Sequence, residues 1–166
     1  MVKVRSFIIA LILVGIGIWA FIHFSPSEER KVRKQFGLLS GWASKAQGET
    51  PLIMAQKTRK IGTLFAENCG LEVPLYSISG NLTRDEIIGY AARGRLLFSE
   101  LSLRFYDLTV SFPEEGIAKV SSTARLTGKL NVGENVDETH ELQCVLKKIG
   151  KRWFFSHMEV VEVLKR

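Results

Sequence analysis

The sequence contains few of the residues that build redox or metal sites. Its 166 residues include two cysteines, Cys69 and Cys144, and three histidines. Two cysteines form neither a disulfide framework nor a Cys-x-x-Cys metal motif, which leaves either two buried thiols or a single disulfide. The sequence shows no glycine-rich phosphate loop, internal repeat or low-complexity tract. It therefore predicts no cofactor and no metal.

The chain also lacks a dense basic stripe. Its 23 Lys and Arg against 17 Asp and Glu give a net charge of +6, a mild excess that predicts no nucleic-acid binding. One local basic cluster could contact anionic lipid headgroups at a membrane surface, or could simply form a solvated helix face: Arg30, Lys31, Arg33 and Lys34.

A long apolar run near the N-terminus predicts a membrane anchor. Residues 7–24 contain no Asp, Glu, Lys or Arg, and as a helix they would extend roughly 27 Å, close to the thickness of a bilayer core. The alternative is a cleaved signal peptide, but no small-x-small cleavage site follows the run. The residues expected in lipid are Phe7, Ile8, Leu11, Leu13, Ile18, Trp19, Phe21 and Phe24.

We therefore expect a short tail and anchor over residues 1–25 and one domain over residues 26–166. The predicted location is a bacterial inner membrane, with a single span and a periplasmic domain. Lys and Arg lie on both sides of the run, so the positive-inside rule leaves the orientation open.

Two helices are predicted first. Ser25 caps the first, Pro26 takes its first position, and Gly48 ends it. Thr50-Pro51 begins the second, which continues to the stop at Asn68-Cys69-Gly70. A short edge strand over residues 71–79 should follow, because it contains Pro74.

Thr83 and Glu86 form a second capping box, which predicts a third helix ending near Phe98. The hydrophobic period then changes to that of a strand. Within residues 101–112 the alternation slips by one residue at Tyr106-Asp107, which indicates a β-bulge and a curved sheet.

Three more strands are expected, over residues 117–132, 136–148 and 151–164. A tight turn at Ile149-Gly150 would place Leu146 opposite Phe155 and Cys144 near His157. The predicted fold class is α+β, with three helices packed on a curved antiparallel sheet.

This pattern resembles the nuclear transport factor 2-like superfamily, whose α+β domains are cone-shaped. The resemblance rests on the T-R-D-E helix start at Thr83, the F-Y-D-L-T-V strand at Phe105 and the K-K-I-G-K-R-W-F-F hairpin at Lys147. The superfamily includes isomerases, dehydratases, ligand binders and membrane-anchored assembly modules, so the resemblance implies a fold and leaves the function open.

Enzymes of this superfamily place Asp, Tyr or His in the mouth of the cone. The residues that could take such roles here are Tyr106, Asp107, His140 and His157. These residues could equally have structural roles, because adjacent residues of a strand, such as Tyr106 and Asp107, usually point to opposite faces of the sheet. A three-ligand metal site from His140, His157 and Cys144 is a further alternative.

Two function hypotheses follow. The first is a non-catalytic, membrane-anchored module that binds a protein partner or a second copy through an apolar patch on the open face of the sheet. The second is a binder, or less readily an isomerase or dehydratase-type enzyme, of a small hydrophobic ligand or lipid held in the cone. The pocket would be lined by Leu103, Phe105, Cys144, Phe155, His157 and Met158.

Overall fold

A computed structural model describes Ile12 and residues 27–74 and 77–161. The chain divides into two compact units, residues 1–31 and 32–166. The predicted anchor lies outside the described residues except for Ile12, which is helical and exposed. None of the helices in the described ranges has both the length and the hydropathy that a membrane span requires. The anchor therefore stays a prediction.

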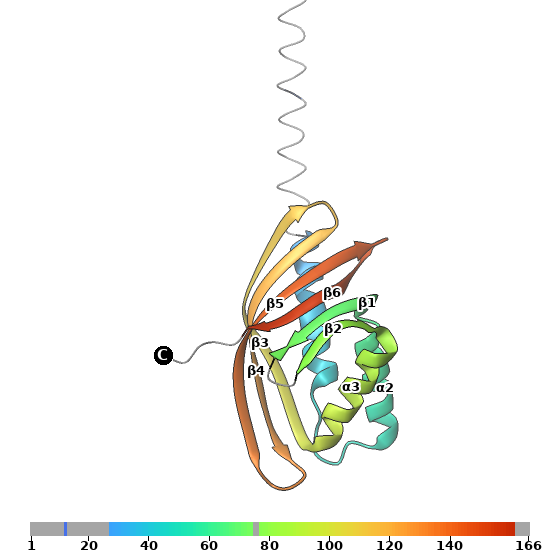
Figure 1. Ribbon diagram of the computed structural model, residues 1–166, viewed down its shortest axis with the longest axis vertical. Coiled ribbons are helices and arrows are strands. Elements are labelled where there is room, and N and C mark those ends of the chain that lie inside the picture. The colour runs from blue at the N-terminus through green and yellow to red at the C-terminus, as the bar shows by residue number, and fades with distance from the viewer. Residues whose placement is uncertain (1–11, 13–26, 75–76, 162–166) are drawn as a thin grey trace, which may run out of the picture. The chain divides into compact units, whose positions relative to one another are not determined.

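The larger unit is α+β, with helices packed on a strongly curved sheet of six strands (Figure 1). Its elements are a helix over residues 32–43, then α2 (Pro51–Gly62), β1 (Phe65–Val73), β2 (Ile78–Thr83), α3 (Arg84–Leu97), β3 (Phe98–Glu114), β4 (Ile117–Leu130), β5 (Asn135–Ile149) and β6 (Arg152–Val161). The strand order is β2-β1-β6-β5-β4-β3. The predicted α+β class is confirmed.

Three local predictions are confirmed. Thr83 caps α3 with a complete capping box to Glu86. The register of β3 against β4 shifts between Tyr106 and Thr109, where the bulge was expected. Leu146 pairs with Phe155 across the last hairpin. The local sequence was therefore sufficient to predict these three features.

Three local predictions are wrong. The first helix ends at residue 43 rather than at Gly48. The second ends at Gly62, and the expected helix stop at Asn68-Cys69-Gly70 lies inside β1. The expected edge strand over residues 71–79 is divided between the end of β1 and the start of β2. In addition, β1 pairs with β6 in parallel, so the sheet is mixed rather than wholly antiparallel.

The helix of residues 32–43 lies along the outer edge of β3 and satisfies its backbone. Ser40 Oγ donates to the carbonyl of Leu103 at 2.5 Å, and the amide of Leu103 donates to Ser44 Oγ at 3.1 Å. Lys45 and Leu101 exchange two backbone hydrogen bonds. These hydrogen bonds fix the helix along the edge of β3, whose backbone groups would otherwise be unpaired there.

The core lies between this helix and the sheet. Val32, Phe36 and Leu39 follow the helical spacing and are buried. The Phe36 ring packs edge-on against Phe105 and Phe155, with centroids 5.2 and 5.0 Å apart. Such pairs stabilise a core beyond the area that they bury.

Helices α2 and α3 pack closely because Gly62 has no side chain. A Cβ at Gly62 would lie 2.6 Å from the side chain of Ile88, so any larger residue here would force Ile88 to move. Figure 1 shows the two helices side by side next to the β1–β2 hairpin. This arrangement places α3 opposite the concave face of the sheet.

A buried ionic cluster joins the first helix to α2 and α3. Arg95 is 2% exposed and donates to the carbonyls of Trp42, Ala43 and Ser44, which end the helix of residues 32–43. It also forms an ion pair with Glu49. Lys57 Nζ lies 2.6 Å from the other oxygen of Glu49. Burial works to raise the pKa of Glu49, but hydrogen bonds from Lys57 and Arg95 outweigh it and hold that pKa below its ordinary value.

Candidate functional site

An apolar cavity of about 330 Å³ lies inside the cone, between the helices and the concave sheet. Its wall comes from the helix of residues 32–43, from α2 and α3, and from five of the strands. The lining residues, mostly apolar, are Leu39, Ala43, Ile61, Phe65, Leu71, Val73, Ile87, Tyr90, Ala91, Leu103, Phe105, Ala124, Leu126, Glu138, His140, Leu142, Met158 and Val160.

Small side chains keep this cavity open. Ala43, Ala91 and Ala124 line it at positions where larger apolar residues would fill the space. Protein interiors are normally packed without such voids, and an apolar void costs stability. The retained volume falls at the lower end of the roughly 300–1,000 Å³ of known ligand pockets. The cavity is therefore large enough for a small ligand.

Two polar side chains of β5 lie at the boundary between the cavity and solvent. Glu138 and His140 are two residues apart and share the face of the strand that lines the cavity. His140 Nε2 lies 3.5 Å from Glu138 Oε2, and the two side chains are 28% and 44% exposed respectively. Tyr90 of α3, which is 40% exposed, lines the same cavity. The cavity therefore has an apolar interior and one polar end.

The predicted pocket residues separate into three groups. Leu103, Phe105 and Met158 line the cavity. Cys144 and Phe155 are buried in the core and are not part of its wall. The ring of His157 lies over Gly70 on the neighbouring strand, where a Cβ would come within 2.5 Å of Nδ1.

The four acid–base candidates do not converge. Tyr106 and Asp107 line an open hollow with Thr123, Arg125, Asp137 and Thr139, and only His140 lines the cavity. Phe105, next to Tyr106, lines the cavity, so Tyr106 points to the opposite, convex face of the sheet. Asp107 has φ of 53° within the bulge. The arrangement keeps the predicted Tyr and Asp away from the cavity histidine.

The convex hollow contains a bidentate ion pair. Arg125 donates to both carboxylate oxygens of Asp137, at 2.9 and 2.7 Å. The hydrogen bond from Arg125 holds the pKa of Asp137 below its ordinary value. Both side chains are about half exposed, so the pair contributes little to stability.

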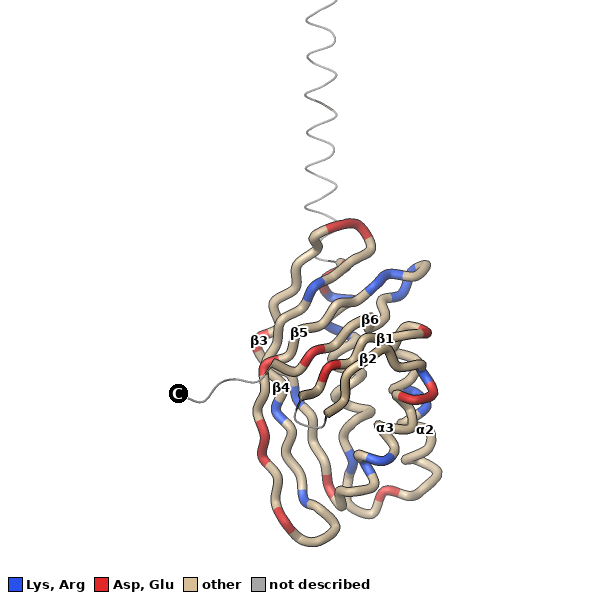
Figure 2. The backbone as a smooth tube through the Cα atoms, in the orientation of Figure 1, with Lys and Arg blue, Asp and Glu red and all other residues tan. Residues whose placement is uncertain are grey.

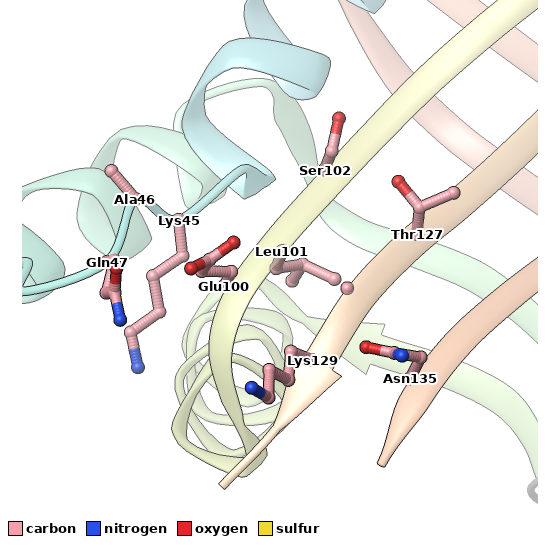
Figure 3. A pocket seen from close by; sticks show the side chains of 10 residues that line it. Lys45, Ala46, Gln47, Glu100, Leu101, Ser102, Thr127, Lys129 and Asn135 are labelled. Atoms are coloured by element: carbon pink, nitrogen blue, oxygen red, sulfur yellow. The ribbon is translucent and has the colours of Figure 1, made fainter. Parts of the chain in front are cut away.

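A second open hollow, shown in Figure 3, lies where β3, β4 and the chain after the first helix meet. Lys45, Glu100, Lys129 and Asn135 surround it. Lys45 Nζ already donates to the carbonyls of Arg95 and Phe98, at 3.2 and 2.5 Å. This lysine is therefore part of the structural contact between the first helix and α3.

Both cysteines are free and buried. Cys69 lies on β1 and Cys144 on β5, with β6 between them. Two strand spacings amount to roughly 9.6 Å, beyond the ~7 Å between Cα atoms that a disulfide can join. Burial raises the pKa of Cys69 to about 11 and also raises that of Cys144. Both side chains are therefore expected to be unreactive thiols.

A metal site built from His140, His157 and Cys144 does not fit the sheet. His157 pairs with Val145, whose neighbours Cys144 and Leu146 face the core, so His157 and His140 point to opposite faces. Over the described ranges, no group of three His, Cys, Asp or Glu side chains gathers as metal ligands.

Sequence reasoning missed Glu138 and Tyr90. Glu138 could have been found, because it stands two residues before His140 in an alternating strand. Tyr90 could not, because its place depends on how α3 packs over the sheet. The four predicted membrane-surface residues are exposed: Arg30, Lys31, Arg33 and Lys34. Their contact with lipid stays a prediction.

The chain matches no protein-family model and no curated protein sequence. Solved structures do resemble it. A candidate scytalone dehydratase from Novosphingobium aromaticivorans is 17% identical, with a TM-score of 0.68 over 84% of this chain and 87% of that one. A protein from Kribbella flavida is 10% identical, with a TM-score of 0.68 over 82% and 91%.

A hexachlorocyclohexane dehydrochlorinase, LinA type 2, is 8% identical, with a TM-score of 0.67 over 82% of this chain and 86% of that one. At such identities the likeness concerns the fold. The larger unit has the nuclear transport factor 2-like fold that the sequence predicted.

Proposed function

We propose that the cone domain binds a small, mainly apolar molecule in its cavity. One observation carries the proposal: about 330 Å³ of space with apolar walls opens beside Glu138 and His140. The three alanines in the wall keep that space open although filling it would stabilise the fold. A ligand supplies the packing that the empty cavity lacks.

The structural neighbours support this ligand class. By its name, the dehydrochlorinase among them acts on hexachlorocyclohexane, a small apolar ring. A shared fold does not transfer catalysis. Here Tyr106 and Asp107 lie on the convex face, apart from His140. The geometry therefore supports binding better than turnover.

The sheet's open face supports the alternative, a docking module for protein partners, less well. On β4 the outward residues between core positions are Lys119, Ser121, Thr123 and Arg125. The last three pair with polar Gln143, Glu141 and Thr139 of β5, and Lys119 pairs with Val145. Figure 2 shows basic and acidic residues interspersed along these strands. A protein partner, membrane attachment and a periplasmic location stay predictions.

Binding of N-phenyl-1-naphthylamine, a neutral fluorophore that brightens in apolar surroundings, tests the proposal. At about 0.3 kcal/mol per heavy atom, its 17 atoms predict a dissociation constant of roughly 0.2 mM or tighter. Ala91→Leu should fill part of the cavity and weaken binding about tenfold. Ala55→Leu makes the same change at an exposed position of α2 and should have no effect.

Equal binding by both variants would contradict the proposal, as would no fluorescence change with the unaltered chain. Ala124→Val, on the opposite wall of the cavity, repeats the test independently of helix packing. Thermal unfolding of each variant shows whether a loss of binding reflects a loss of folding.

A further inference from the structure

We propose that the ligand carries a hydrogen-bond donor, and best an ammonium group, at one end of its apolar body. Glu138 would accept this group at the polar end of the cavity. The inference rests on the proposed function, because it specifies the chemistry of the molecule that enters the same site.

The placement of Glu138 supports this ligand class. Glu138 pairs with Leu126 and His140 pairs with Ala124, and all four residues line the cavity. The carboxylate thus stands at the mouth of the cavity, where its side chain is 44% exposed. A donor attached to a ligand in the apolar interior would meet it at the opening. Hydrogen bonds with a charged partner are roughly twice as strong as neutral ones.

The charges around the cavity point the same way. Among its described lining residues there is no Lys or Arg, and Glu138 supplies the negative charge. Arg93 of α3, whose guanidinium lies 4.6 Å from the centre of the Tyr90 ring, does not line the cavity. A carboxylate ligand would face Glu138 without a lining cation to balance it, whereas an ammonium ligand would pair with it.

The neighbouring groups limit where an amine can bind. His140 Nε2 lies 3.5 Å from Glu138 Oε2, so the imidazole shares the carboxylate with the incoming donor. The ring of Tyr90 lines the same cavity, and the guanidinium of Arg93 already lies 4.6 Å from the centre of that ring. The acceptor at the polar end is therefore the Glu138 carboxylate.

Four molecules of nearly equal size test the inference on the full chain: ethylbenzene, 2-phenylethanol, phenethylamine and phenylacetate. Each molecule is titrated into the protein at pH 7.5, and binding is measured by calorimetry or NMR. Phenethylamine should show the highest affinity, 2-phenylethanol a lower one, and phenylacetate the lowest. We expect phenethylamine to bind about tenfold more tightly than ethylbenzene.

Glu138→Gln should remove that tenfold advantage, change ethylbenzene binding less than twofold, and strengthen phenylacetate binding. Glu141→Gln provides the matched control, because Glu141 lies on the same strand but is exposed and is not part of the cavity wall. It should leave all four affinities unchanged.

The outcomes separate the two proposals. If ethylbenzene binds but phenethylamine gains nothing over it, or if phenylacetate binds best, the inference is wrong and the proposed function stands. If Glu138→Gln leaves the amine preference intact, the inference is again wrong. If none of the four molecules binds, the proposed function fails as well.

Discussion

Replacing Arg95 by methionine should strongly destabilise the domain. The guanidinium donates to three carbonyls at the end of the first helix, at 2.6, 2.5 and 2.9 Å, and pairs with Glu49. Methionine fills much of the space but donates nothing. The substitution therefore leaves the three carbonyls without this donor. It also leaves the carboxylate of Glu49, which is only 3% exposed, with Lys57 as its one remaining ion-pair partner of these two.

Breaking a buried pair by removing one partner costs about 3–5 kcal/mol. We expect a loss of that size in the free energy of unfolding. Glu49→Gln should cost about 2 kcal/mol, since Arg95 keeps its three carbonyls and only the charged partner is lost. The double substitution should cost about 1–3 kcal/mol less than the sum of the two, because the residues interact directly.

Urea unfolding of the full chain, followed by tryptophan fluorescence, measures these values. Trp42 adjoins the cluster and Trp153 lies in the core, so both report on the fold. Arg93→Met provides the control, because Arg93 is exposed on the same helix; it should change stability by less than about 0.5 kcal/mol. A loss below about 1 kcal/mol for Arg95→Met would refute the reasoning.

The same cluster predicts a pH dependence. The pKa of Glu49 is lowered in the folded protein. Its contribution is therefore fully present above the pKa of the unfolded chain, near 4.5, and is lost as the pH falls through the lower folded value. Between pH 7 and pH 3 the unaltered chain should lose more stability than Glu49→Gln does; equal losses would contradict this.

Two further predictions concern a helix end and the thiols. Thr83→Ala removes the hydroxyl that accepts from the Glu86 amide and should lower the free energy of unfolding in urea by about 1 kcal/mol. Thr109→Ala, at an exposed strand position, should lower it less. An equal loss would show that the Thr83 hydroxyl does not stabilise the helix as a cap. Cys69 and Cys144 are both buried, so a thiol reagent at pH 7.5 should label neither in the folded chain and both in urea, and rapid labelling of the folded chain would contradict their placement.

Features decided by adjacent residues could be predicted from the sequence. The Thr83–Glu86 capping box needs only two side chains three positions apart. The bulge at Tyr106-Asp107 appears directly as a slip in the alternation of apolar residues. The last hairpin was predicted to within one residue, because its strands are joined by a two-residue turn. Further along, the register of β5 against β6 shifts between Val145 and Leu146, so His157 lies opposite Val145 rather than Cys144.

The end of α2 could not be predicted, because distant residues decide it. Leu64 and Phe65 fit the apolar stripe of a helix as well as they fit a strand. In the structure Phe65 pairs with Phe155 of β6, and the amide of Phe155 donates to the carbonyl of Leu64. This contact links residues about ninety positions apart, and a local pattern contains no information about it.

The candidate site was predicted in part for the same reason. Leu103, Phe105 and Met158 follow from strand alternation and line the cavity. Cys144 and Phe155 also point to the inner face of the sheet, but they are packed within the core and do not border the cavity. Which inward residues face open space depends on α3 and on the alanines around it, and the sequence pattern does not show this.

The place of β6 has a consequence for how the protein is made. β1 and β2 join the sheet only through β6, the last described strand. While the chain is being synthesised, residues 65–83 therefore have no edge to join until residues 152–161 have left the ribosome. Contacts between such distant segments form slowly. We expect residues 65–83 of a newly made chain to stay unassembled until β6 has been made, and to need protection from aggregation during that time.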